Sequence, residues 1–174
     1  AVSGFFISLT DYDGLGAVAG AAKVGFKNYR KLFGDDKFWL ALKNTFVVWL
    51  YIVPGRTFLA LIMATLLNSS KLLGKKVYSV VVLLPYVTAV AVVAIIFRIL
   101  LTTEGGLINV ILGQRIGWLD TTALSKVSVA IMNIWRMVGY FSLVLLAGMQ
   151  KIPGSVHEAA AIDGAGKLTG FFKI

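Results

Sequence analysis

The sequence of 174 residues lacks cysteine entirely and contains one histidine, His157. Without cysteine the chain has no disulfides, thiolate metal sites or cysteine nucleophile, and a single histidine excludes a multi-histidine metal site. Charged residues are also few, at 14%, whereas hydrophobic residues make up 58% and the mean hydropathy is +0.84. A soluble domain of this length carries more charge, so we expect the apolar excess to face lipid.

Signatures of catalysis and nucleotide binding are missing as well. The sequence has no Walker A motif, and its eight acidic residues all lie outside the long apolar runs, so we expect neither ATP hydrolysis nor another reaction from this chain. The net charge of +9 comes from lysines and arginines that lie mostly between the apolar runs, where basic residues anchor membrane proteins. Because no nucleic-acid-binding motif accompanies them, we expect no nucleic acid partner.

Three apolar runs are long enough to cross a bilayer, which takes about 20 helical residues. They are residues 44–67, 77–101 and 127–149. A backbone in lipid must satisfy its own hydrogen bonds, so these runs predict helices, and Pro85 predicts a bend in the second. The fold class is therefore an all-α, polytopic transmembrane bundle with three complete spans. Since the chain begins at Ala1, we expect a fragment of a larger protein.

Three arginines lie within these runs, although a charge at the bilayer centre costs about 3 kcal/mol on insertion scales. Arg98 is near the end of its run, where its side chain can reach the interface. Arg56 follows Pro54 and Gly55 near mid-span, and the glycine lets another helix approach. Arg56 should point into the bundle, where it either lines a pathway or forms a structural pair.

The third run carries a polar stripe. Asn133, Arg136 and Tyr140 are spaced i, i+3, i+7 and share one helical face. A polar stripe on an apolar helix faces the bundle rather than lipid. It predicts a polar solute path, and the alternative is interhelical hydrogen bonding that only holds the bundle together.

The segment after the third run predicts a short helix. Residues 150–165 read QKIPGSVHEAAAIDGA. Ser155 can cap a helix that begins near Val156, Glu158 would complete a capping box, and the alanines favour helix. Gly164 permits a sharp turn at its end. A short helix with small side chains suits docking into a groove of another protein, and the alternative is an amphipathic helix at the membrane interface.

This segment closely resembles the EAA loop of permease subunits from binding-protein-dependent ABC importers. In that loop an EAA triplet is followed after three residues by glycine, and after nine more by Ile-x-Leu-Pro. Here Glu158-Ala159-Ala160 precedes Gly164 at that spacing, and Ile174 stands where the isoleucine is expected. Five other segments of this chain resemble sugar-type permeases such as MalF, UgpA and LacF. The five segments are Phe26-Lys27-Asn28-Tyr29, Leu83-Leu84-Pro85, Ile96-Phe97-Arg98, Gly106-Leu107-Ile108-Asn109 and Leu146-Ala147-Gly148-Met149-Gln150.

The resemblance implies a MetI/MalF-like fold and import of a sugar. The partners that it implies are a second permease subunit, an extracytoplasmic sugar-binding protein and an ATPase dimer that holds ATP and magnesium, whereas this chain would hold no cofactor. The residues that it implies for ATPase docking, on the EAA loop 150–174, are Glu158, Ala159, Ala160, Ile162, Asp163 and Gly164. Another small solute, such as glycerol phosphate or an amino acid, remains an alternative, and a secondary transporter or channel is the rival from another class.

Lysine and arginine counts do not resolve the orientation in the membrane. Three lysines crowd into residues 69–76, but six basic residues lie between Lys23 and Lys43 on the opposite side. The resemblance implies that residues 69–76 and 150–174 are cytoplasmic. Residues 10–43 and 102–126 would then be extracytoplasmic, in a multi-pass protein of the inner membrane.

Overall fold

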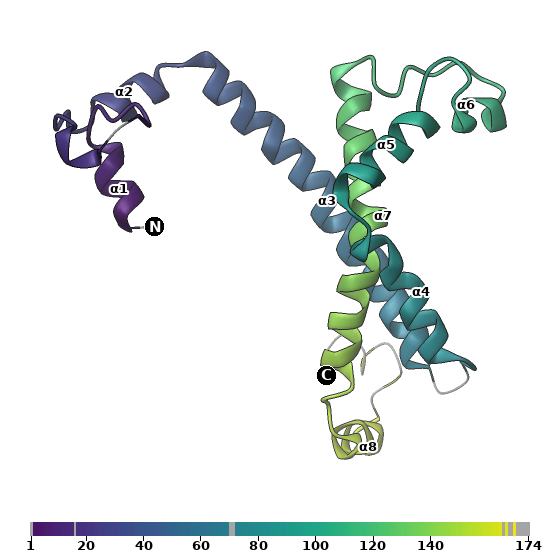
Figure 1. The fold of residues 1–174 in the computed structure, drawn as a ribbon. Helices are drawn as coiled ribbons and strands as arrows, with labels where there is room; N and C mark the ends of the chain where they lie inside the picture. Colours follow the sequence, from purple (N-terminus) through teal and green to yellow (C-terminus); the bar gives the residue numbers. More distant parts are fainter. Residues whose placement is uncertain (1, 16, 70–71, 165, 167–168, 170–174) are drawn as a thin grey trace. The chain divides into compact units, whose positions relative to one another are not determined.

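The computed structural model describes residues 2–169 except 16, 70–71, 165 and 167–168. The described chain is helical, with one isolated antiparallel bridge between Thr10 and Lys23. Its elements are α1 (Val2–Ser8), the 3-10 helix η1 (Val18–Gly20), α2 (Lys27–Phe33), α3 (Asp36–Asn68), α4 (Lys75–Val87), α5 (Val90–Leu100), α6 (Leu107–Leu112), α7 (Thr122–Met149) and α8 (Gly154–Ile162). The all-α fold class is therefore confirmed. Figure 1 shows the path of the chain.

The chain divides into two compact units, Ala1–Val47 and Val48–Ile174. In the first unit, polar side chains fix the long connection between α1 and α2. The Asn28 side-chain amide donates to the backbone oxygens of Ser8 (2.9 Å) and Thr10 (2.8 Å). The Tyr29 hydroxyl lies 2.6 Å from Ser8 Oγ. These bonds give the Asn-Tyr pair of the sequence a structural role, because they hold α1 and α2 together.

The first long helix begins earlier than the apolar run that predicts it. Asp35 caps it, since its carboxylate accepts from the backbone N–H of Lys37 (2.8 Å), and Trp39 Nε1 donates to the Phe33 backbone oxygen (2.8 Å). No proline or glycine interrupts residues 36–43, so the helix continues into residues 44–67. α3 is 33 residues long, more than the roughly 20 that cross a bilayer.

The second predicted span is broken rather than gently bent. Residues 77–101 fall in two helices, α4 and α5, whose axes differ by 90° at a break over Thr88 and Ala89. The break lies three residues beyond Pro85, the site predicted for a bend. Pro85 has no N–H to donate, and Thr88 bonds Leu84 O through both its N–H (3.3 Å) and its hydroxyl (3.0 Å). The chain then leaves the helix in an extended conformation.

Two helices of the described chain, α3 and α7, are long and apolar enough to cross a membrane alone, and α4 with α5 make a third span if the bent pair counts as one. Residues 44–67 and 127–149 lie inside α3 and α7. Only 6% of the most apolar window of α3 and 17% of that of α7 are buried within the chain. The remaining apolar surface is available to lipid or to other helices.

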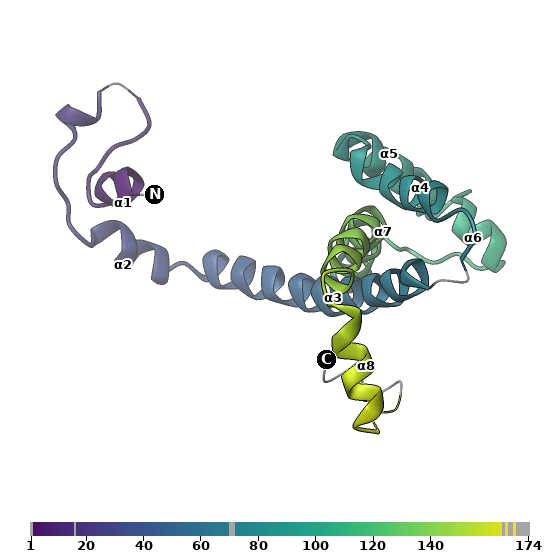
Figure 2. The ribbon, with the colours of Figure 1, turned by 90° about the horizontal axis from the view of Figure 1, so that it is seen from below.

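Small residues set the helix crossings in the second unit. A Cβ at Gly139 of α7 would overlap the backbone carbonyl of Val82 in α4, so only glycine permits this approach. A Cβ at Gly55 of α3 would lie 3.0 Å from Ile134 Cδ1 of α7. Figures 1 and 2 show α7 beside α4 in both views, and this is the most extensive helix packing among the described helices.

A compact polar loop connects α5 to α7. Asn109, 5% exposed, donates its side-chain amide to the backbone oxygens of Thr103 (3.0 Å) and Ile116 (2.9 Å) and accepts from Trp118 Nε1 (2.8 Å). Thr121 then caps α7, since its hydroxyl oxygen accepts from Leu124 N–H (3.3 Å). The loop is therefore a folded structure with its own buried polar centre.

Candidate solute path and docking helix

Arg56 points from α3 toward α7, as the sequence predicted for a residue facing the bundle. Its guanidinium carbon lies 3.8 Å from the ring centroid of Phe141 on α7, and the side chain is half-buried. This is a cation–π contact, which stabilises a partly desolvated cation by about 0.5–2 kcal/mol. The Arg56 Nε is buried and has no hydrogen-bond partner among the described residues.

Arg136 lies against the end of the broken span. Its Nη2 donates to the backbone oxygen of Tyr86 (3.4 Å), and its Nη1 lies 3.5 Å from Met137 Sδ. Tyr86 is in the last turn of α4, where the break leaves carbonyls without helical partners. A cation is favourable at a helix C-terminus, so Arg136 offsets part of the cost of interrupting a helix in the membrane. Sequence reasoning did not identify Tyr86 as its partner.

Tyr140 stacks on the same tyrosine. The rings of Tyr86 and Tyr140 are 4.6 Å apart and 16° from parallel, and the Tyr140 ring also meets Phe141 edge-on at 5.4 Å. These aromatic rings connect the two arginines, because one contacts Phe141 and the other Tyr86. We call Arg56, Tyr86, Arg136, Tyr140 and Phe141 the arginine–aromatic cluster.

Asn133 lies one turn before Arg136 on α7 and is half-buried. Its side-chain amide has no hydrogen-bond partner among the described residues. The structure therefore brings Arg136 and Tyr140 together at Tyr86 and leaves Asn133 beside them on the same helical face. The i, i+3, i+7 spacing of the sequence identified this face, whereas the contribution of α4 needed the three-dimensional crossing.

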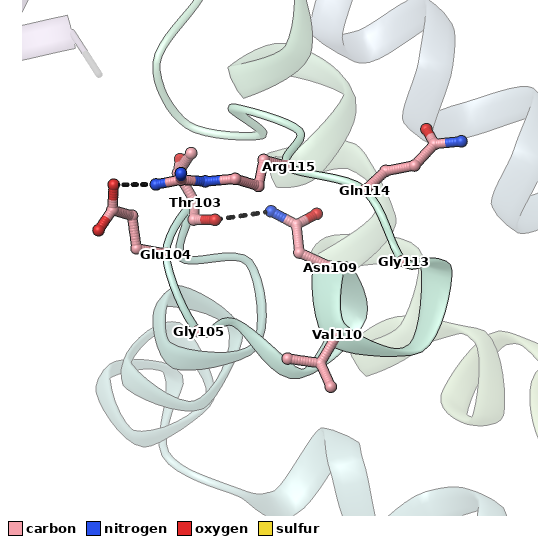
Figure 3. Close-up of a pocket in the computed structure, with 8 residues that line it drawn as sticks. All are labelled: Thr103, Glu104, Gly105, Asn109, Val110, Gly113, Gln114 and Arg115. Carbon is pink, nitrogen blue, oxygen red and sulfur yellow. Dashed lines mark hydrogen bonds and ion pairs between the residues drawn. The ribbon is translucent and has the colours of Figure 1, made fainter.

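The loop 102–126 carries an open, shallow cavity that the sequence did not predict. Its volume is about 420 Å³, and Figure 3 shows the residues that line it, namely Thr103, Glu104, Gly105, Asn109, Val110, Gly113, Gln114 and Arg115. Glu104 and Arg115 form an ion pair at the surface. The Thr103 hydroxyl donates to Asp120 Oδ2 (2.7 Å). Glu104, Arg115 and Asp120 thus have partners within the loop.

α8 occupies the EAA segment. The helix runs over Gly154–Ile162, and Gly164 follows in the left-handed conformation with φ +77°. The expected cap is wrong, because the helix begins before Ser155 and that residue lies inside its first turn. Pro153 accounts for the earlier start, since its carbonyl accepts from Val156 N–H (3.0 Å).

The side chains named for docking lie at the surface of α8. Ile162 is 86% exposed. Glu158, Ala159, Asp163 and Gly164 are exposed and Ala160 is half-buried. Figure 1 shows α8 at the end of α7 that is opposite to the loop with α6. The helix therefore presents Ala159 fully and Ala160 in part at an exposed surface.

Comparison with known proteins decides the family. Residues 56–174 match the family described as binding-protein-dependent transport system inner membrane component. The chain belongs to this family. It is therefore an integral membrane component of a transport system, and the long apolar helices α3 and α7 fit that assignment.

Individual relatives agree with this assignment. The chain is 36% identical over 160 residues to the probable ABC transporter permease protein YurN of Bacillus subtilis, covering 87% of this chain and 54% of that protein. It is 35% identical over 145 residues to the lactose transport system permease protein LacF of Rhizobium radiobacter, covering 80% and 49%. A solved bacterial alginate ABC transporter, in complex with an alginate pentasaccharide-bound periplasmic protein, contains a chain that superposes with a TM-score of 0.74 at 26% identity, covering 86% of this chain and 54% of that one. The chain spans about half the length of these relatives.

Proposed function

We propose that the protein containing this chain is a permease subunit that imports a carbohydrate delivered by an extracytoplasmic binding protein. Family membership supports the dependence on a binding protein. The relatives named for lactose and alginate support a carbohydrate as the solute. ATP and magnesium would be bound by a separate ATPase dimer, and a second permease subunit would complete the membrane part. The observation that carries the proposal is α8, an exposed helix with the EAA sequence at the end of a long apolar helix.

Within this function, α8 is the element that docks onto the ATPase. Small side chains at Ala159 and Ala160 allow close approach of a partner, and exposed Ile162 offers an apolar contact. Glu158 and Asp163 add negative charge that suits a basic groove. The left-handed φ of Gly164 ends the helix and turns the chain. Closure of the ATPase dimer would then move α7 through α8, because the two helices are joined by only four residues, 150–153.

The polar face of α7 is the proposed solute path. Asn133, Arg136 and Tyr140 supply hydrogen-bonding groups beside an aromatic stack, the combination that ligand sites commonly use. The structure also gives Arg136 a structural contact at Tyr86, so the residue serves the bundle as well as the path.

The test of the function is reconstitution of the complete importer, with full-length permeases, ATPase dimer and binding protein, in proteoliposomes. We expect uptake of a carbohydrate that requires both ATP and the binding protein. Uptake that is driven by an ion gradient and is independent of ATP would instead identify a secondary transporter. Uptake of an amino acid or glycerol phosphate, without any carbohydrate, would identify another solute class.

The absence of cysteine gives a direct test of docking and topology. These 174 residues have no native thiol, so once any cysteine elsewhere in the full-length permease is replaced, Ala160→Cys supplies its only thiol. We expect this thiol to cross-link to the ATPase subunit, and the thiol of an Ile111→Cys variant on α6 to react with a membrane-impermeant maleimide from the extracytoplasmic side. Ile111 is 71% exposed, so reaction from the cytoplasmic side alone would reverse the proposed topology.

A further inference from the structure

The membrane segments contain cations without any anion. Residues 44–67, 77–101 and 127–149 include Arg56, Arg98 and Arg136 but no aspartate or glutamate. Arg98 is exposed in the last turn of α5, where its side chain can reach the interface. Arg56 and Arg136 are half-buried within long helices. A guanidinium at that depth is costly unless a counter-charge or water compensates it.

Contacts within the chain compensate these two arginines only in part. Each guanidinium has five N–H donors. The contact described for Arg56 is with an aromatic ring. Those for Arg136 are with one backbone carbonyl at 3.4 Å, a thioether sulfur and the Tyr86 ring, whose centroid lies 5.8 Å from the guanidinium carbon. Both Nε atoms are buried without a partner among the described residues. The cluster is thus a positively charged site whose donors are largely uncommitted.

We infer that the solute carried along this face is a carbohydrate with a negatively charged group, a carboxylate, sulfate or phosphate. Arg136 is the principal counter-charge, and Arg56 adds positive potential at Phe141. The inference rests on the proposed function, since it names the class of sugar that would use the same path. An arginine fork matches a carboxylate or phosphate with two parallel hydrogen bonds. Low-dielectric surroundings strengthen that attraction relative to water.

The neighbours of the arginines fit a sugar better than they fit a protein carboxylate. Asn133 presents an unpartnered amide on the same face as Arg136, and the Tyr86–Tyr140 stack presents flat apolar surface. A sugar acid offers hydroxyls to the amide, C–H groups to the rings and a charge to the arginine. An acidic side chain from the rest of the permease or from a second permease subunit would neutralise Arg136 but would leave the Asn133 amide without a role.

The experiment compares matched pools of oligosaccharides in the complete reconstituted importer. One set bears carboxylate, sulfate or phosphate groups, and the other set is the same material after these groups have been reduced or removed. We expect only the charged set to stimulate ATP hydrolysis and to be taken up. Stimulation by the neutral set alone, or by both sets equally, would overturn the inference while leaving carbohydrate import intact. Failure of both sets would instead contradict carbohydrate import.

Substitutions of Arg136 then test whether this residue supplies the positive charge that attracts the solute. Arg136→Gln keeps an N–H donor for the Tyr86 carbonyl but removes the cation, and we expect uptake of the charged sugar to fall about tenfold or more. Arg136→Lys should restore part of the loss, and Arg98→Gln is the matched control that should transport like the parent. Binding-protein affinity and co-purification of the subunits are measured alongside. If Arg136→Gln loses assembly instead of uptake, its counter-charge belongs to another segment of the permease or to a partner subunit, and the inference is wrong.

Discussion

The loop 102–126 and the arginine–aromatic cluster differ in how completely their polar side chains find partners within the chain. In the loop, Asn109 uses its side chain in three hydrogen bonds, and Arg115 pairs with Glu104. In the cluster, Arg56 and Arg136 keep buried Nε atoms without partners among the described residues. A polar group that is satisfied within the chain stabilises the fold, whereas one left unsatisfied in a low-dielectric region indicates a ligand or a partner. The difference separates structural from functional residues.

The largest effect should come from the helix crossing that positions the cluster. A Cβ at Gly139 would overlap the Val82 carbonyl, so Gly139→Leu must separate α4 from α7. Overpacking of this kind costs about 1–3 kcal/mol or more, and we expect little folded permease to be recovered in detergent. Gly148→Leu on the same helix is the control, since nothing lies near a Cβ there. Equal recovery of the two variants, measured by size-exclusion chromatography, would show that the crossing does not depend on glycine.

Asn109→Ala tests whether the hydrogen bonds inside the loop 102–126 stabilise the fold. The change removes three hydrogen bonds and leaves the Trp118 indole N–H without its acceptor. Leaving such a group unsatisfied costs about 1–3 kcal/mol, so the thermal midpoint of the permease in detergent should fall by several degrees. Gln114→Ala, an exposed change in the same loop, should leave it unchanged. An Asn109→Ala variant as stable as the parent would remove the proposed polar centre of the loop.

Asn133→Ala tests whether an amide without a partner among the described residues serves transport rather than stability. Because the Asn133 amide has no partner among the described residues, we expect the stability of the permease to change by less than about 0.5 kcal/mol. Transport affinity or rate should change several-fold. If the variant assembles poorly, the amide holds helices together in the complete transporter, and if it assembles and transports normally, it has neither role.

The smallest effect is expected at the surface ion pair. Glu104 and Arg115 have side chains that are 78% and 72% exposed, so their pairing is largely screened by solvent. Glu104→Gln should lower the stability of the permease by less than about 1 kcal/mol, and added salt should reduce that difference further. A larger loss in thermal unfolding would mean that the pair organises the cavity of the loop, and the two regions would then differ less than we infer.

Much of the architecture could be predicted from run length and spacing. Residues 44–67 and 127–149 lie in single helices, and Gly164 has the left-handed φ expected of a turn. The 90° break at Thr88 and Ala89 could not be predicted, because a proline weakens a helix but does not determine where the helix ends. α8 begins at Gly154, before Ser155, the cap expected from the sequence. The backbone oxygen of Pro153 accepts a hydrogen bond from the N–H of Val156, which accounts for this earlier start.

Of the arginine–aromatic cluster, the sequence predicted the residues that share one face of α7 but not the partner residue on α4. The polar face of α7 follows from the spacing of Asn133, Arg136 and Tyr140, but the partner Tyr86 depends on the close crossing at Gly139. Periodicity in a single helix carries no information about which neighbour meets it. The same limit applies to Asn109, since its three partners come from both ends of a loop that has no periodic pattern.

Coupling between transport and ATP hydrolysis tests the central claim most directly. Gly164→Val places a β-branched residue at φ +77°, whereas Gly166→Val changes a nearby glycine outside the left-handed region. The measurement is ATPase activity, ATPase co-purification and sugar uptake in the same reconstituted complex. We predict that Gly164→Val loses the ATPase or hydrolyses ATP without uptake, while the membrane helices remain inserted and Gly166→Val is much less affected. A Gly164→Val complex that binds the ATPase, hydrolyses ATP and imports sugar like the parent would contradict the account.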